Sequence, residues 1–335
     1  EIIVCDNTQG YAIDENDNNS EDPNQSIVDV VNTFRAKGYP VYLMDWKDLN
    51  YHDGVEYSQG DYNNCYIYNT ATKVSYPKFK TPSGRNYVSL RSGVWDSLSA
   101  SYDTSKLCII NFPVLKHHGM AGATVAVKNW IGVMSVDWAN ERYGGWSAMH
   151  YTYLFTQYAL VARIMAVTYP RLSIVDAAWT SAAGNTSSDY VVNTKALFAS
   201  TDPVAVSWYA AKYMLTPVAY NKTETNPDLP GGKYHDCLTN WKNFFVDSAG
   251  IACTMDSTKI SVYNRGSLAQ MPLPSIPLLD SPANGVTNQL RVLSLYWSPS
   301  SYAMTYHLQV ATDSIFSNPL LNDSSLNDVT FHLTG

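Results

Sequence analysis

The stretch from Leu107 to Val136 constrains the fold more than any other part of the chain. Its sequence, LCIINFPVLKHHGMAGATVAVKNWIGVMSV, is strongly apolar, and only Lys116 and Lys128 carry a full charge at neutral pH. The run KLCIINFPVL is typical of a buried central strand, and residues 121–134 have the pattern of a following helix. A segment this apolar belongs in the core of a domain, so its two lysines need partners there.

Strand and helix patterns alternate on both sides of this stretch. EIIVCDN and YPVYLMDW are typical of strands, and a helix capped by Ser26 and stopped by Gly38 lies between them. RLSIVDAAW and KALFAS are further strand patterns, with helices expected over 153–167 and 202–215. This order predicts an α/β fold, a mostly parallel sheet with crossover helices.

The composition changes abruptly near residue 268. SLAQMPLPSIPLLDSPANG is rich in proline and predicts an extended connector. LRVLSLYW, YAMTYHLQVATD and DVTFHLTG then follow as alternating runs separated by turns, which predicts a small all-β module. We therefore expect an α/β domain over 1–267, a proline-rich linker over 268–282 and a β module over 283–335.

The charge content excludes several partners and favours an extracellular setting. Only 15% of residues are charged, the net charge is −7, and 25 residues are tyrosine. No long basic run is present, so nucleic acid is not an expected partner. No apolar run reaches the roughly 18 residues that span a bilayer. The chain starts at Glu1 rather than Met, as a processed secreted protein does.

Motif searches exclude several kinds of cofactor and reaction. The cysteines show no CxxC spacing, so a cysteine-ligated iron–sulfur cluster is not expected. Whether Cys237 and Cys253 pair is left open by the sequence. The G-x-S-x-G, H-E-x-x-H and G-x-G-x-x-G motifs are absent, so nothing supports a serine hydrolase, a zinc protease or a dinucleotide-dependent dehydrogenase.

The two lysines point to an anion site. The loop between them contains Gly119 and Gly122, and backbone N–H groups at the start of the expected helix would face an anion held by two ammonium groups. A phosphate or a carboxylate would both fit. The alternative is that the lysines extend past apolar surface to solvent, or pair with a buried carboxylate such as Asp176.

Several other polar residues follow predicted strands. Asp6, Lys116, His117 and Asp176 are all expected at strand ends, where open α/β sheets bind ligands. We take Lys116, His117, Lys128 and Asp176 as candidate catalytic residues of a shared cleft.

A divalent metal site is a weaker hypothesis. His118, His150 and Asp202 are candidate ligands, since imidazole and carboxylate groups bind such ions. No spacing motif supports them, and isolated histidines are more often simply hydrogen-bonded. Asp202 is also explained as the N-cap of the helix over 202–215.

Three motifs resemble one protein family. INFPVLKHH followed by ATVAVKNWIGVMS, then PRLSIVDAAW, then ASTDPVAVSWYAAKYML are similar in order and content to domain-of-unknown-function family 362, from residue 1 to about 265. In that family a lysine-histidine loop follows a strand and leads into a helix with a lysine and a short GV turn. The matching residues here are Lys116, His117 or His118, Thr124, Lys128, Asn129, Gly132, Asp176, Asp202 and Pro203.

This resemblance implies an architecture rather than an activity. It places Thr124 and Asn129 with the lysines, so we count them with Asp6, Gly119 and Gly122 as candidate ligand-binding residues. Many relatives carry cysteine-rich ferredoxin-type segments, which this chain lacks.

The C-terminal module resembles part of a fibronectin type III module of secreted bacterial proteins, a fibronectin or immunoglobulin-like sandwich. SPANG, a strand ending in Trp297 and YHLQVATDSIF carry this likeness. A partial module leaves a sheet edge at which another chain can add a strand.

Two functions follow from these patterns, and whether the protein is an enzyme is left open. The favoured one is a secreted, self-associating structural or surface component, such as a filament, tube or layer subunit, built on an enzyme-like α/β domain. The alternative is an enzyme or binding protein that acts on an anionic small molecule through a Lys/His/Asp cleft.

Overall fold

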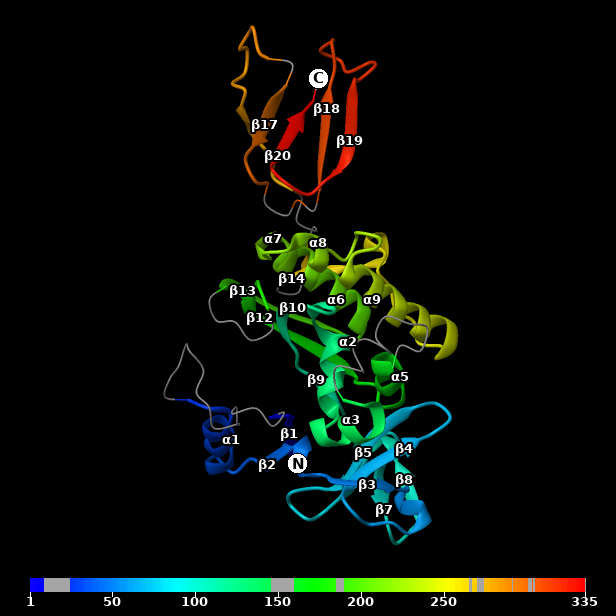
Figure 1. Ribbon diagram of the computed structural model, residues 1–335. Coiled ribbons are helices and arrows are strands. Elements are labelled where there is room, and N and C mark those ends of the chain that lie inside the picture. Colours follow the sequence, from blue (N-terminus) through cyan, green and yellow to red (C-terminus); the bar gives the residue numbers. More distant parts are fainter. Residues whose placement is uncertain are drawn as a thin grey trace.

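The protein is described by a computed structural model, shown in Figure 1. Its central part is a mixed sheet covered on one face by helices, with a separate, mainly antiparallel sheet below it and a small β region at the C-terminal end. No helix among the described residues is long and apolar enough to cross a membrane. The described residues are 1–8, 25–145, 160–184, 190–264, 267–269, 274–290, 292–300, 303 and 305–334.

The predicted central strand over residues 106–115 is confirmed only in part, because it forms two shorter strands of the mixed sheet, and the second continues through the lysine-histidine residues 116–118 that were expected in a loop. The sheet order is β11-β10-β12-β13, and β9 also pairs with β12. β10 runs antiparallel to β11 and parallel to β12, whereas β12 and β13 are antiparallel. The strands are β9 (Ile110–Asn111), β10 (Val114–His118), β11 (Gly122–Thr124), β12 (Leu172–Ser181) and β13 (Val191–Ser200).

The prediction of a mostly parallel sheet is therefore wrong. Parallel pairing occurs in β10–β12, β9–β12, β1–β2 and β3–β4, and the other strand pairs are antiparallel. Chain reversal between β10 and β11 takes a short turn instead of a crossover helix, and such turns join only antiparallel strands. The predicted strand–helix–strand unit at the N-terminus does form, as β1 (Ile2–Asp6), α1 (Ile27–Ala36) and β2 (Val41–Asp45).

Residues 50–103 form a six-stranded sheet. The strands are short and interrupted by turns, which hides their alternation from a pattern search. Lys78 of β5 is completely buried there, and its Nζ lies 3.0 Å from Asp61 Oδ2. The strands are β3 (Asn50–Gly54), β4 (Cys65–Asn69), β5 (Val74–Lys80), β6 (Tyr87–Ser89), β7 (Gly93–Asp96) and β8 (Ser101–Asp103).

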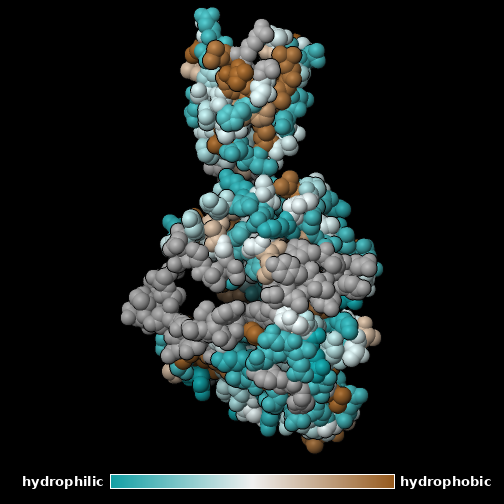
Figure 2. Space-filling view, viewed as in Figure 1, coloured by the Kyte–Doolittle hydropathy of each residue, from teal (hydrophilic) through white to brown (hydrophobic). Residues whose placement is uncertain are grey.

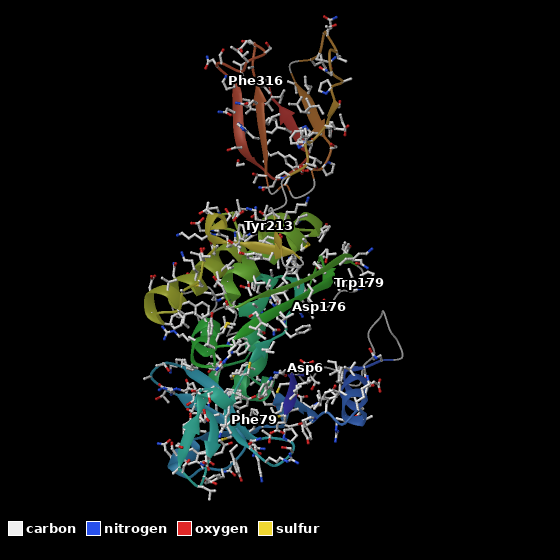
Figure 3. The ribbon with its side chains drawn as sticks, turned by 180° about the vertical axis from the view of Figure 1, so that it is seen from behind. Asp6, Phe79, Asp176, Trp179, Tyr213 and Phe316 are labelled. Atoms are coloured by element: carbon white, nitrogen blue, oxygen red, sulfur yellow. The ribbon has the colours of Figure 1, made fainter. Side chains whose placement is uncertain are left out.

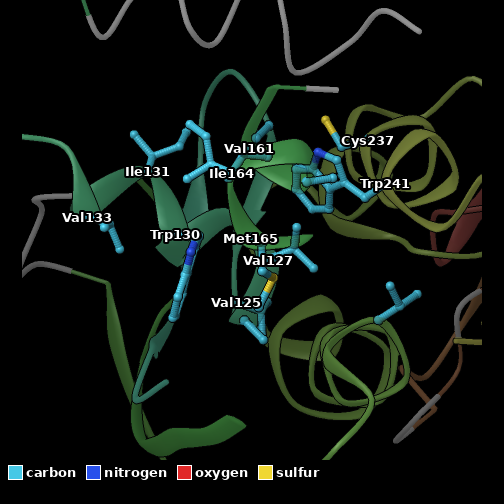
Figure 4. Packing of buried hydrophobic residues seen from close by; sticks show 14 of the residues in the cluster. Val125, Val127, Trp130, Ile131, Val133, Val161, Ile164, Met165, Cys237 and Trp241 are labelled. Carbon is cyan, nitrogen blue, oxygen red and sulfur yellow. The ribbon is translucent and has the colours of Figure 1, made fainter. Parts of the chain in front are cut away.

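The helices pack over one face of the mixed sheet, and their apolar side chains form the main core (Figure 4). The predicted helix over 202–215 is confirmed, and the helix α9 (Lys233–Asn243) follows it near the end of the domain. Both continue as short π-helical segments, Ala211–Leu215 and Phe244–Ser248. Of the helix expected over 153–167, Leu160–Val167 is helical as α5, and residues 153–159 lie outside the described residues. The helices are α2 (Ala126–Asn129), α3 (Val136–Tyr143), α5 (Leu160–Val167), α6 (Pro203–Ala210), α7 (Thr216–Val218), α8 (Lys222–Thr225) and α9 (Lys233–Asn243).

The single helix predicted over 121–134 is wrong. The chain there forms β11, the four-residue α2 and a 3₁₀ turn over Trp130–Val133. Gly122 has a φ of +79°, and β11 pairs with β10, so tertiary contacts override the helical pattern. A helix of four residues offers no N-terminal anion site, so the prediction that backbone N–H groups at its start face an anion is wrong.

The C-terminal region is a small antiparallel sheet structure. β16, β17 and β20 form one sheet, and β18 and β19 form another. β16 lies within the expected linker, and a hairpin of β14 and β15 precedes it. The strands are β14 (Val262–Asn264), β15 (Ser267–Ala269), β16 (Leu279–Ser281), β17 (Leu293–Trp297), β18 (Tyr306–Val310), β19 (Leu321–Leu326) and β20 (Thr330–Leu333).

Candidate functional site

The fold brings Lys116 and Lys128 together. Lys116 lies on β10, and the β10–β11 hairpin returns the chain so that α2 begins next to that strand. Lys128 is only 7% exposed. Burial, followed by the positive charge of Lys116, holds the pKa of Lys128 at about 7. No hydrogen bond or ion pair joins the side-chain amine of Lys128 to another described residue, so this amine has no internal partner there.

The surroundings of Lys128 are apolar. Its neighbours in sequence pack into the core with side chains of α5 and α9, and Figure 4 shows Val127 close to Met165. Cys237 of α9 also faces Lys128, but burial raises the pKa of this thiol, which therefore stays uncharged. Cys237 and Cys253 are both free thiols, so the pairing that the sequence left open does not form.

Asp6 is the acidic residue that faces Lys116. Burial lowers the pKa of Lys116, and the carboxylate of Asp6 acts in the opposite direction. Asn7 fixes the end of β1 in this position, since its side-chain amide donates to the carbonyl oxygens of Gly132 and Met134, at 2.7 Å each. Asp6 thus ends β1 and lies close enough to Lys116 to affect its pKa, whereas Lys116 lies within β10 and not at a strand end, where the sequence predicted it.

Thr124 supplies an unused hydroxyl beside the lysines. It lies opposite Lys116 in the β10–β11 pair, and its Oγ1 is buried without a hydrogen-bond partner in the described part of the chain. Asn129, by contrast, is occupied, because its Nδ2 donates to Asn111 Oδ1 at 2.9 Å. Asn111 in turn donates to the carbonyl oxygen of Ala126 at 2.9 Å, so Asn129 anchors α2.

His117 is held on the other side of β10 by a network that the sequence did not reveal. Its Nδ1 accepts a hydrogen bond from the Gly184 backbone N–H at 2.9 Å, so its ring proton is on Nε2, 3.2 Å from Glu224 Oε2. Lys233 donates to Glu224 Oε1 at 2.6 Å and to the Gly119 carbonyl oxygen at 2.7 Å. Burial opposes ionisation, but the hydrogen bonds from Lys233 and His117 lower the pKa of Glu224. No motif in the sequence marks Glu224 or Lys233.

The next residues shape the turn between β10 and β11. The backbone N–H groups of Met120 and Ala121 both lie 3.3 Å from His118 Nδ1, which accepts from them. A Cβ on Gly122 would lie 2.1 Å from the Glu224 carbonyl oxygen, whereas one on Gly119 would meet nothing within 4 Å. Gly122 therefore permits close packing of the hairpin on α8 and α9.

The sequence predicted that Asp176 ends its strand. This prediction is wrong, because β12 continues to Ser181. Asp176 Oδ1 accepts from the Ala178 N–H at 2.9 Å, and no ion pair joins Asp176 to either lysine within the described residues. The alternative that a lysine pairs with Asp176 is thus wrong. Figure 3 shows Asp176 near Trp179, whereas Asp6 lies at the end of a different strand.

The candidate metal ligands are not brought together in the described structure. Asp202 accepts from the backbone N–H groups of Val204, Ala205 and Thr254 at 2.8–2.9 Å, as an N-cap does. Burial raises the pKa of Asp202 in spite of these bonds. His150 lies outside the described residues. Within them, no group of three His, Cys, Asp or Glu side chains is placed to hold a metal.

Comparison with known families gives one match. The sequence model described as Domain of unknown function (DUF362) matches residues 24–212, which is more than half of the chain. The match includes both lysines, His117 and Thr124, and excludes Glu224, Lys233 and the C-terminal region. Comparisons with curated proteins and with solved structures found no match.

We expect Gly122→Ala to destabilise the protein by about 2–4 kcal/mol, because the new methyl group meets backbone and the φ is unfavourable. Gly119→Ala is the matched control and should stay within about 1 kcal/mol of wild type. Urea unfolding followed by circular dichroism measures both. Equal stability of the two variants would show that the close approach at Gly122 is absent.

We also expect Lys128 to make stability depend on pH. Its pKa is about 7 in the folded protein against 10.5 for the unperturbed group, so unfolding takes up a proton between these pH values. The folded state should therefore gain stability as the pH rises through this window, by about 1 kcal/mol per pH unit. Unfolding free energies of Lys128→Met should lack this slope, whereas Lys106→Met, which removes an exposed lysine, should retain it. Parallel curves for wild type and Lys128→Met would refute the assignment.

Proposed function

The chain belongs to the DUF362 family, and on that basis we propose that its α/β domain binds an anionic small molecule at Lys116 and Lys128. The observation that carries the proposal is the nearly complete burial of Lys128 without a carboxylate partner in the described structure. Buried charges in proteins are normally paired. A bound carboxylate or phosphate would supply the missing charge.

Electrostatics favours an anion over other ligands. The two ammonium groups repel each other, and the charge of Lys116 therefore lowers the pKa of Lys128. An anion between them would relieve this repulsion and raise that pKa, so binding would draw a proton onto Lys128. The buried hydroxyl of Thr124 would add a neutral hydrogen-bond donor on the same side of the hairpin.

Other predicted site residues have supporting roles in this proposal. His117 is held by Gly184 and Glu224 and so positions β10 rather than contacting the ligand. Asp6 faces Lys116 and limits the excess positive charge at the edge of the site.

Binding of oxalate and sulfate tests this function, because neither changes charge between pH 6 and 8. Affinity in calorimetry should rise as the pH falls through 7, and Lys116→Met and Lys128→Met should each weaken binding by roughly tenfold or more. Lys195→Met removes an exposed lysine on β13 and should leave affinity unchanged. If neither anion binds the wild type more tightly than the two site variants at low salt, the proposal fails.

A second candidate function is self-association through the C-terminal region, which we propose to be a partial fibronectin type III-like sandwich. Its division into β16-β17-β20 and β18-β19 supports this, as does the contact between Trp297 and Tyr306, whose rings lie 5.6 Å apart. The two-stranded sheet leaves a free edge on β18 within the described residues, where a strand of another chain would fit.

Exposed apolar side chains also favour assembly. They gather on this region in Figure 2, and the low charge fraction of 15% opposes close contact only weakly. Such a surface fits an extracellular structural component. Among the exposed apolar side chains are Leu279, Leu290, Val292, Ile315 and Leu320, which are 64–81% exposed.

Sedimentation velocity over a concentration series, with electron microscopy of the same samples, tests self-association. Wild type should form ordered assemblies, and Ile315→Lys with Leu320→Lys should shift them toward monomer, since both residues are exposed and outside the core. Leu98→Lys changes a residue that is 97% exposed, in the turn between β7 and β8, and should have no effect. A monomer at every concentration would exclude this role.

A further inference from the structure

We propose that Lys128 is a carbonyl-reactive amine that forms an imine with a small anionic aldehyde or ketone, such as a 2-oxo acid, whose anionic group is held by Lys116. This inference rests on the proposed anion site and names the class of ligand that it takes.

The fold itself provides a comparison between two buried lysines. Lys78 has no exposed surface, and its Nζ pairs with Asp61 Oδ2 at 3.0 Å, donates to the Asp61 carbonyl oxygen at 2.6 Å and lies over the Tyr57 ring. This is how a structural lysine is satisfied in a core. Lys128 is 7% exposed and has none of these contacts with described residues. An amine left without acceptors keeps its lone pair available for a ligand.

The charged and titratable groups around Lys128 keep its amine partly neutral. Lys116 faces it from β10 and Cys237 from α9. Burial first, and then the charge of Lys116, hold the pKa of Lys128 at about 7, so about half of the molecules carry a neutral amine at neutral pH. An exposed lysine at that pH has roughly a thousandfold less neutral amine. Desolvation next to a second cation is a known way to activate a lysine nucleophile.

The cysteines are weaker candidates for a nucleophile. Burial raises the pKa of Cys65 and of Cys253 to about 12 and also raises that of Cys237. Because the thiolate is the reactive form, these thiols are inert at neutral pH. Lys128 is therefore a more reactive nucleophile at neutral pH than any of these three thiols.

The reaction needs no oxidant, reductant or metal. The neutral Lys128 nitrogen attacks the carbonyl carbon, a C–N bond forms, and the amine proton passes to the former carbonyl oxygen. The carbinolamine then loses water, so that amine plus carbonyl gives imine plus water. Lys116 keeps its proton throughout and pairs with the ligand's carboxylate. Thr124, which lies opposite Lys116 in the β10–β11 pair, supplies its Oγ1 hydroxyl as a hydrogen-bond donor.

The test is trapping with glyoxylate and sodium borohydride, which reduces the imine to a stable secondary amine. Peptide mapping by mass spectrometry should find one modification per chain, on Lys128, at a rate that rises as the pH rises through 7 and above, because the bound carboxylate raises the pKa of the amine from its value of about 7. Lys116→Met should reduce this labelling by roughly tenfold or more with glyoxylate. With the uncharged glycolaldehyde the same variant should differ much less from wild type.

Lys128→Arg separates this inference from the anion site, because it keeps the positive charge and removes the nucleophile. It should still bind oxalate and should lose the modification. Oxalate binding by wild type without labelling of Lys128 would overturn the imine while leaving the anion site intact. Labelling spread evenly over exposed lysines would overturn it as well. Absence of both binding and labelling in wild type would overturn both proposals.

Discussion

The close contact between Gly122 and the backbone of Glu224 is the constraint on which the arrangement of the site depends. Without a side chain at Gly122, β11 can pack against α8 and α9 and still pair with β10. That pairing sets Thr124 opposite Lys116 and starts α2 beside β10, so Lys128 is directed toward Lys116. The hairpin therefore places the two lysines of a long apolar segment close enough for the charge of Lys116 to lower the pKa of Lys128.

Burial without pairing gives Lys128 its chemistry. A buried ammonium group that lacks an acceptor loses its proton easily, and a neighbouring cation adds to the effect. Lys78 shows the opposite outcome in the same chain, because Asp61 compensates its charge. The protein thus contains both a structural and an uncompensated buried lysine. An uncompensated one costs stability, which is typical of functional sites rather than of cores.

Local patterns predicted the parts of the fold in which near neighbours decide the structure. The unit β1–α1–β2 forms with Ser26 as its cap, and Asp202 caps α6 as expected. The prediction failed where distant contacts dominate. Residues 121–134 have a helical pattern, yet pairing with β10 makes the first of them a strand. Asp176 was expected at the end of a strand, but pairing with β13 extends β12 beyond it.

The sequence by itself indicated that the stretch around Lys116 and Lys128 packs into the core, because no other fully charged residue lies between Leu107 and Val136. In the structure Lys128 is buried and Lys116 is half-buried. Only the tertiary structure decided what each polar group faces. Asp6 reaches Lys116 from another sheet, and His117 turns to Glu224, which is 107 residues away. Burial follows from the composition of a segment, whereas pairing depends on which distant strands meet. Electrostatic energies depend on the distance between the charged groups, and only the tertiary structure sets that distance.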